Sequence, residues 1–200
     1  MGVTVTIEEL IVWLEANTTH VCDFMDYDLI GDPVAKWEDW LDAWFGSRGW
    51  RDMGHRLVLL GQDYTDGRFA AWVRADAPGS CPIVFFSSEG GSGVLCASGE
   101  KWVQILAHAP TIVEYERGDR AAHVSDEENW CLDEGWNPTR AAEARDSLAY
   151  YREVLRASFG HLPPLDELTT GLDELNRAFA SWIEAVVSGA PKRVQPMGSL

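Results

Sequence analysis

The stretch Pro82–Trp102, PIVFFSSEGGSGVLCASGEKW, is the most informative part of the sequence for the fold. A short apolar run leads into a glycine-rich loop, and a second apolar run follows the loop. Glycine and serine between two such runs are typical of a turn that joins two buried strands. Ser98 is of the residue type that caps helices, and the following segment GEKWVQILAHA has the apolar spacing of a helix. We therefore expect two paired strands followed by a helix.

The glycine-rich loop lacks the signatures of three known catalytic or cofactor-binding loops. A phosphate-binding loop needs a lysine after its glycines, and a dinucleotide-binding loop needs a helix there. The nucleophile elbow Gly-x-Ser-x-Gly fails at Ser92, because Val94 stands where the closing glycine should be. We therefore interpret the loop as a turn, with Glu89 at a strand end where its side chain can face a ligand or partner.

A second pair of strands precedes this stretch. The apolar runs HRLVLLGQD and RFAAWVRA are joined by YTDG, and Asp66-Gly67 is a strong hairpin signal. Helical patterns lie on both sides of the four strands. This order predicts an α+β fold with a mostly antiparallel sheet of four or more strands, flanked by N-terminal and C-terminal helices.

The helices on the N-terminal side have recognisable ends. Thr6 and Glu9 form a capping box before TIEELIVWLEAN, and Asp32 with Pro33 begins DPVAKWEDWLDAWFG. The second helix carries an apolar stripe of Trp37, Trp40, Leu41 and Trp44. Core packing is the favoured interpretation of this stripe, ahead of a ligand platform.

The C-terminal part is divided into an acidic segment and two helices. Residues 111–138 are polar and acidic and are interpreted as a long loop or insertion. Thr139 is predicted to cap the next helix, and a last helix is predicted from about Thr170 to Val187. We expect a single domain over residues 1–190, with a core at about 30–110 and C-terminal helices at 139–190.

The net charge of the 200-residue chain is −16. Residues 1–45 hold ten acidic residues against one lysine, whereas residues 46–76 are nearly balanced. Such a balance argues against nucleic acid as the direct ligand, because phosphates are bound through clustered Lys and Arg. It favours a basic protein partner. The simpler interpretation of such a charge run is that the acidic residues only keep the helix faces solvated.

Cysteine and histidine spacing predicts neither a metal site nor a disulfide scaffold. The four cysteines are far apart, and no Cys-x-x-Cys pair occurs. A Ser/His/Asp triad needs no proximity in sequence and stays open, but no motif indicates one. The chain shows no signal-peptide pattern and no apolar run of membrane-spanning length, so we expect a cytoplasmic protein with reduced thiols and no cofactor.

The motif order over residues 57–106 resembles the core of the SUKH superfamily, which includes fungal cell-wall assembly regulators and bacterial toxin-immunity proteins. In that family a strand ends near an Asp and a Gly turn, a Pro-Val-type strand runs into a Glu-Gly loop, and a strand and a helix with an aromatic residue follow. The matching positions are Gly61, Asp66, Gly67, Pro82, Val84, Glu89, Gly90, Ala97, Ser98 and Trp102. The C-terminal ninety residues depart from the family pattern.

This resemblance implies an α+β fold and a non-catalytic role in binding protein, in many members the neutralisation of a toxin, often a nuclease. The acidic charge fits such a basic partner independently. The predicted partner-binding residues are Asp39, Asp42, Asp63, Tyr64, Asp66 and Glu89. Two alternatives stay open: a regulatory or scaffold adaptor that docks through its C-terminal helices, and a small-molecule enzyme with a pocket at the glycine loop.

Overall fold

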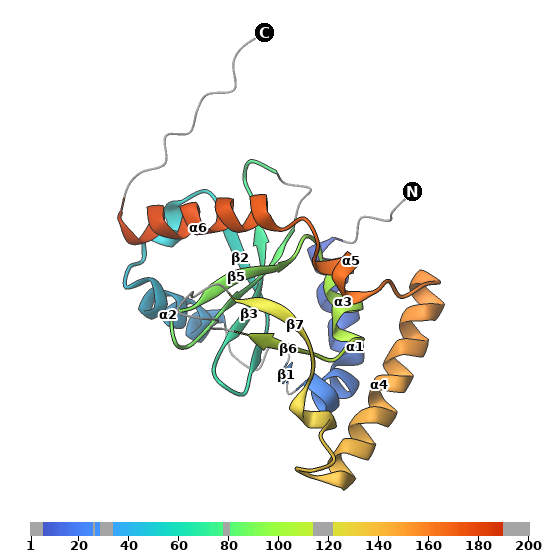
Figure 1. The fold of residues 1–200 in the computed structure, drawn as a ribbon. Coiled ribbons are helices and arrows are strands. Elements are labelled where there is room, and N and C mark those ends of the chain that lie inside the picture. The colour runs from blue at the N-terminus through green and yellow to red at the C-terminus, as the bar shows by residue number, and fades with distance from the viewer. Residues whose placement is uncertain (1–5, 26, 29–33, 78–80, 114–121, 190–200) are drawn as a thin grey trace.

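A computed structural model describes residues 6–25, 27–28, 34–77, 81–113 and 122–189, and a central antiparallel sheet organises them (Figure 1). The strands are β1 (Tyr27–Asp28), β2 (Arg56–Asp63), β3 (Arg68–Val73), β4 (Ile83–Phe86) and β5 (Ser92–Cys96), and they lie side by side in this order. Each strand pairs antiparallel with the next. The predicted α+β class and both predicted strand pairs are confirmed.

Both faces of the sheet are buried. Successive side chains of a strand point to opposite faces, so Phe69 and Ala71 of β3 belong to one core while Ala70 and Trp72 belong to the other. Strand β4 divides in the same way, with Phe85 in the first core and Phe86 in the second. The short strands are therefore continuous apolar runs, and helices must cover the sheet on two sides.

The first face is covered by helices from both ends of the chain. These are α1 (Ile7–Met25), α3 (Gly99–Leu106), α4 (Pro138–Phe159) and the short α5 (Leu165–Thr169). The capping box of α1 is present, since Glu9 accepts from Thr6 N at 2.8 Å and Thr6 Oγ1 accepts from Glu9 N at 3.2 Å. Ser98 caps α3 as predicted.

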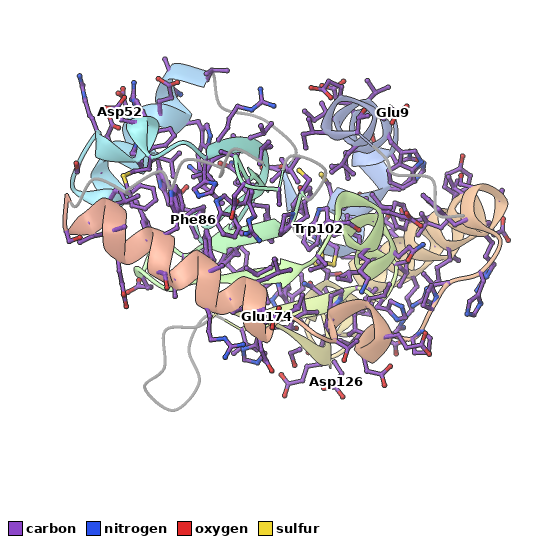
Figure 2. The ribbon with its side chains drawn as sticks, turned by 90° about the horizontal axis from the view of Figure 1, so that it is seen from above. Glu9, Asp52, Phe86, Trp102, Asp126 and Glu174 are labelled. Carbon is purple, nitrogen blue, oxygen red and sulfur yellow. The ribbon has the colours of Figure 1, made fainter. Side chains whose placement is uncertain are left out.

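The second face is covered by α2 (Val34–Phe45), the single turn η1 (Gly49–Asp52) and α6 (Asp173–Val187). In Figure 1, α2 and α6 lie on the side of the sheet away from α1 and α4. Figure 2 shows Phe86 among side chains beside α6 and Trp102 beside α3. Trp37 and Leu41 of α2 are buried in this second core, and Trp40 and Trp44 are half-buried against it, which confirms that the predicted stripe packs inward.

The prediction of an irregular loop over residues 111–138 is wrong for much of the described part. Strands β6 (Pro110–Val113) and β7 (His123–Glu128) form a second, two-stranded sheet, and the turn η2 (Trp130–Leu132) follows. The hairpin is anchored to the main sheet where Ala122 N donates to the carbonyl of Ser92 at 3.2 Å. The sequence does not indicate these strands, because only one side of the hairpin packs on the core and the acidic end of β7 is exposed.

Two predicted helix starts are also corrected. Asn137, not Thr139, caps α4, since its Oδ1 accepts from Arg140 N at 3.1 Å and Pro138 takes the first helical turn. The last helix begins at Asp173, because Thr170 is extended and Gly171 has a φ of 73°. Asp32 and Pro33 lie outside the described residues. No helix in the described ranges has both the length and the apolarity to cross a membrane.

Candidate functional site

The turns of the two predicted hairpins lie together at one end of the sheet. We call the β2–β3 turn (63–67) and the β4–β5 turn (87–91) the turn rim. Ser88 Oγ of one turn donates to the carbonyl of Thr65 in the other at 2.7 Å. Trp44 Nε1 of α2 donates to the carbonyl of Ser87 at 2.8 Å. Alternate hairpins of an antiparallel sheet place their turns at the same end, so four predicted residues (Asp63, Tyr64, Asp66 and Glu89) share this rim.

The glycine loop is an ordered turn. Ser87 N donates to the carbonyl of Gly91 at 2.8 Å, Glu89 N donates to Ser87 Oγ at 3.0 Å, and Gly90 has a φ of 88°. These amides are used by the turn itself, so they do not form a cradle for a phosphate. Glu89 projects from the turn as an exposed residue.

The Asp63 carboxylate stabilises the β2–β3 turn to which it belongs. Its Oδ1 accepts from Thr65 N at 3.0 Å, from Thr65 Oγ1 at 2.8 Å and from Gly67 N at 2.8 Å. This arrangement holds the hairpin in place and lets Asp66 adopt a φ of 67°. Gly67 is required beside it, because a Cβ at this position would overlap the ring of Phe85.

Arg68 lies beneath the rim and compensates part of its acidity. The side chain is 5% exposed, and its guanidinium lies 5.1 Å from the ring centre of Trp40. Arg68 Nη1 donates to the carbonyl of Asp66 at 3.0 Å and approaches its carboxylate at 3.4 Å. The Asp66 carboxylate is nevertheless 77% exposed, so it stays available to a partner.

The two predicted residues of α2 differ in their surroundings. Asp39 is exposed, whereas the Asp42 carboxylate accepts from Trp50 Nε1 at 2.9 Å and from Arg51 Nη2 at 2.9 Å, and pairs with Arg48 at 3.1 Å. Desolvation alone would raise the pKa of Asp42, but the hydrogen bond from Trp50 and the charges of Arg51 and Arg48 outweigh it and lower the pKa. Asp42 therefore joins α2 to η1.

Replacing Asp42 by Asn should lower the melting temperature, because the variant loses the charge that holds Arg48 and Arg51. A carboxylate with a lowered folded pKa stabilises the protein above its unfolded pKa and stops doing so as the pH falls through the folded value. The advantage of the wild type should therefore be lost only as the pH falls below 3.8, the ordinary value of an aspartate pKa. Melting curves at neutral and acidic pH check this. The exposed Asp39→Asn is the matched control, and an equal loss in both variants would contradict the structural role of Asp42.

An aromatic cluster of two exposed rings and one half-buried ring continues the rim onto the segment that precedes α4. Tyr64 is 70% exposed, and its ring centre lies 5.8 Å from that of Trp130. Trp130 in turn contacts Trp136, which is 56% exposed, with ring centres 4.5 Å apart. The guanidinium of Arg140 lies 5.6 Å and 5.8 Å from the two indole rings. We call Tyr64, Trp130 and Trp136 the aromatic cluster.

Beside the aromatic cluster lies a cavity of about 680 Å³, which we call the acid cleft. Its lining consists of Thr111, Glu127, Glu128, Asn129, Trp130, Leu132, Asp133, Glu134 and Arg145. Arg145 donates to the carbonyl of Leu132 at 2.9 Å and forms an ion pair with Glu134. Four carboxylates thus face one guanidinium, and the cleft keeps a negative balance.

Sequence reasoning selected Tyr64 but not its neighbours in the aromatic cluster. Trp130, Trp136 and the carboxylates of the cleft belong to the segment that was interpreted as an irregular insertion. The available signal was its composition, since ENWCLDEGWNPTR places two tryptophans in an otherwise polar stretch. Large aromatic rings in a polar segment either fill a core or remain at a surface for contact.

Two further cavities are smaller and mostly apolar. One of about 280 Å³ lies between α1 and α3 and is lined by residues such as Leu10, Trp13 and Val103. The other, of about 270 Å³, lies between β5 and α6. The glycine loop 87–91 lines none of the three cavities.

The four cysteines, all among the described residues, form no disulfide, and their thiols are mostly shielded from solvent. Cys96 and Cys131 are buried, and Cys22 and Cys81 are half-buried. Burial raises the pKa of Cys96 to about 12, so at neutral pH it is a protonated thiol and a poor nucleophile. Within the described residues, no cluster of three or more His, Cys, Asp or Glu side chains is arranged to hold a metal ion.

Comparison of the chain with protein-family models, with curated proteins and with solved structures finds no match in any of the three. The turn rim, the aromatic cluster and the acid cleft are therefore the features that bear on function.

Proposed function

We propose that this chain is a non-catalytic, cytoplasmic protein-binding domain of the SUKH type, an immunity protein that neutralises a basic toxin such as a nuclease by direct contact. The observation that carries the proposal is the aromatic cluster, with Tyr64 and Trp136 exposed, set between the acidic rim and the acid cleft. Exposed aromatic residues that gather into one patch are characteristic of interaction surfaces.

The chemistry of this surface suits a basic protein. Tyr, Trp and Arg dominate the binding energy of interfaces, whereas charges around them steer the encounter. Here Tyr64 and Trp136 supply the rings, and Asp66 and Glu89 stand on the adjacent turns. A nuclease presents a basic substrate cleft, and an acidic inhibitor at net charge −16 can occupy or cover that cleft.

The two alternatives have less support. The glycine loop uses its amides within the turn and lines none of the three cavities described above, which weakens the case for an enzyme pocket there. An adaptor that docks through its last helix would need a free apolar stripe. Phe179, Trp182 and Val186 of α6 are instead buried against the sheet.

A protection assay tests the proposal. Each open reading frame that neighbours the gene is expressed in a bacterial host, alone and together with this chain. We expect one product to be toxic and basic, to be neutralised by co-expression, and to form a complex with the purified chain. If the chain relieves none of these toxicities, the immunity function is wrong.

Tyr64→Ala should weaken the complex with that partner about thirtyfold, the effect of losing one interface anchor worth about 2 kcal/mol. Calorimetric titration at fixed salt concentration measures the loss. Tyr150→Ala is the matched control, because Tyr150 is 50% exposed on α4 and its ring contacts His20 rather than the aromatic cluster. Equal affinities of the two variants would place the interface elsewhere.

A further inference from the structure

The aromatic cluster and the acid cleft share one residue, Trp130, and therefore form a continuous surface. We propose that this surface binds an arginine side chain on a basic segment of the partner, stacked on Trp136 and directed toward the carboxylates of the cleft. This inference rests on the proposed function and specifies where and how the basic partner is recognised.

The charge of the cleft is not balanced from within. Arg145 is engaged by Glu134 and by the Leu132 carbonyl. Among the described residues, no ion pair joins Glu127 or Glu128 to a cation, and both are exposed. The charge of Glu128 attracts the Arg152 guanidinium, but Arg152 Nε donates to the Ala107 carbonyl at 2.7 Å. A cation from a partner would therefore find acceptors at the end of β7.

Arg140 of the protein itself shows that Trp130 and Trp136 can hold a guanidinium against their rings. Its guanidinium lies within 6 Å of both ring centres, the range in which a cation is attracted to the face of an indole. The two rings meet edge to face at 85°, so they do not cover each other, and more than half of Trp136 is open to solvent. A second guanidinium can use the open part of Trp136.

Arginine fits this surface better than lysine. A guanidinium is planar, stacks on aromatic rings and offers a fork of donors that matches a carboxylate, whereas an ammonium is a compact and strongly hydrated charge. The surface presents both kinds of acceptor next to each other. We therefore expect the surface to bind an arginine peptide more tightly than a lysine peptide of equal charge.

The position of the surface agrees with this role. Asp126 lies at the outer edge of the molecule (Figure 2), on the strand that carries Glu127 and Glu128. The Asp133 carboxylate accepts from Gly135 N at 2.8 Å, and Asn137 N donates to the Asp133 carbonyl at 3.3 Å. These bonds fix the turn that carries Trp136, so the platform is ordered before a partner arrives.

The test is a calorimetric titration of the full chain with oligoarginine and oligolysine peptides of equal length at low salt. We expect oligoarginine to bind about tenfold more tightly than oligolysine, and Trp136→Ala to remove most of that preference. The Glu127→Gln/Glu128→Gln double variant should weaken oligoarginine about tenfold. The indole N–H signal of Trp136 in the NMR spectrum should shift on binding.

A matched double variant separates a site from general attraction. Glu153→Gln/Glu184→Gln removes the same charge from exposed positions on α4 and α6. Equal losses in the two double variants, equal affinity for the two peptides, or no binding at all would overturn the inference. None of these results decides the protection assay. If the cleft variants still protect the host, the proposed function stands. If oligoarginine binds but the chain relieves no toxicity, the proposed function alone is contradicted.

Discussion

Trp182→Ala is expected to lower the free energy of unfolding by about 4 kcal/mol, the usual cost of removing a buried tryptophan. Trp182 is fully buried on α6, and its ring centre lies 5.6 Å from Phe45 and 5.9 Å from each of Trp72 and Phe179. The side chain therefore joins α2, the sheet and α6 in one core. Its removal leaves a cavity that three rigid rings cannot fill.

Denaturant unfolding followed by circular dichroism measures this loss. Val187→Ala on the same helix is the control, because Val187 is 61% exposed and should change stability by about 0.5 kcal/mol or less. If Trp182→Ala does not fold, Trp182→Phe keeps part of the ring contact and should show a smaller loss. A wild-type midpoint in the alanine variant would mean that α6 does not pack on the sheet.

The sequence predicted the sheet well because the hairpins carry strong local signals. Asp66-Gly67 and the glycine loop mark two turns, and short apolar runs on each side leave few alternative structures. What local signals could not reveal is the division of β3 and β4 between two cores. Phe85 and Phe86 are the same residue type, and only the helices that cover each face distinguish them.

The candidate site was predicted only in part. Tyr64, Asp66 and Glu89 were placed at strand ends, and the antiparallel order brings those ends together. Asp42 and Asp63 were selected by their charge. The bond of Asp42 to η1 depends on tertiary structure, and the bonds of Asp63 depend on the geometry of the β2–β3 turn, and a count of charges contains neither.

Trp130 and Trp136 were missed for a different reason. Their segment has no helical or strand period, and its position depends on two long-range contacts. The β6–β7 hairpin packs on β5, and Asn129 N donates to the Ala109 carbonyl at 2.9 Å. A surface whose parts come from Tyr64 and from residues beyond position 126 is created by the fold rather than by any one motif.

Gly93→Ala should lower the free energy of unfolding by about 3 kcal/mol and also disturb the proposed arginine site. A Cβ at Gly93 would overlap the carbonyl oxygen of Ala122, a backbone atom that cannot move without the β6–β7 hairpin. The same hairpin carries Glu127 and Glu128. Chemical denaturation should therefore show a loss of stability, and oligoarginine should bind the folded variant more weakly. Ser92→Ala, one residue earlier on β5, adds no such overlap and should behave as wild type. Full stability together with unchanged peptide binding in Gly93→Ala would mean that the hairpin is not held against β5, and the acid cleft would then lack its supporting wall.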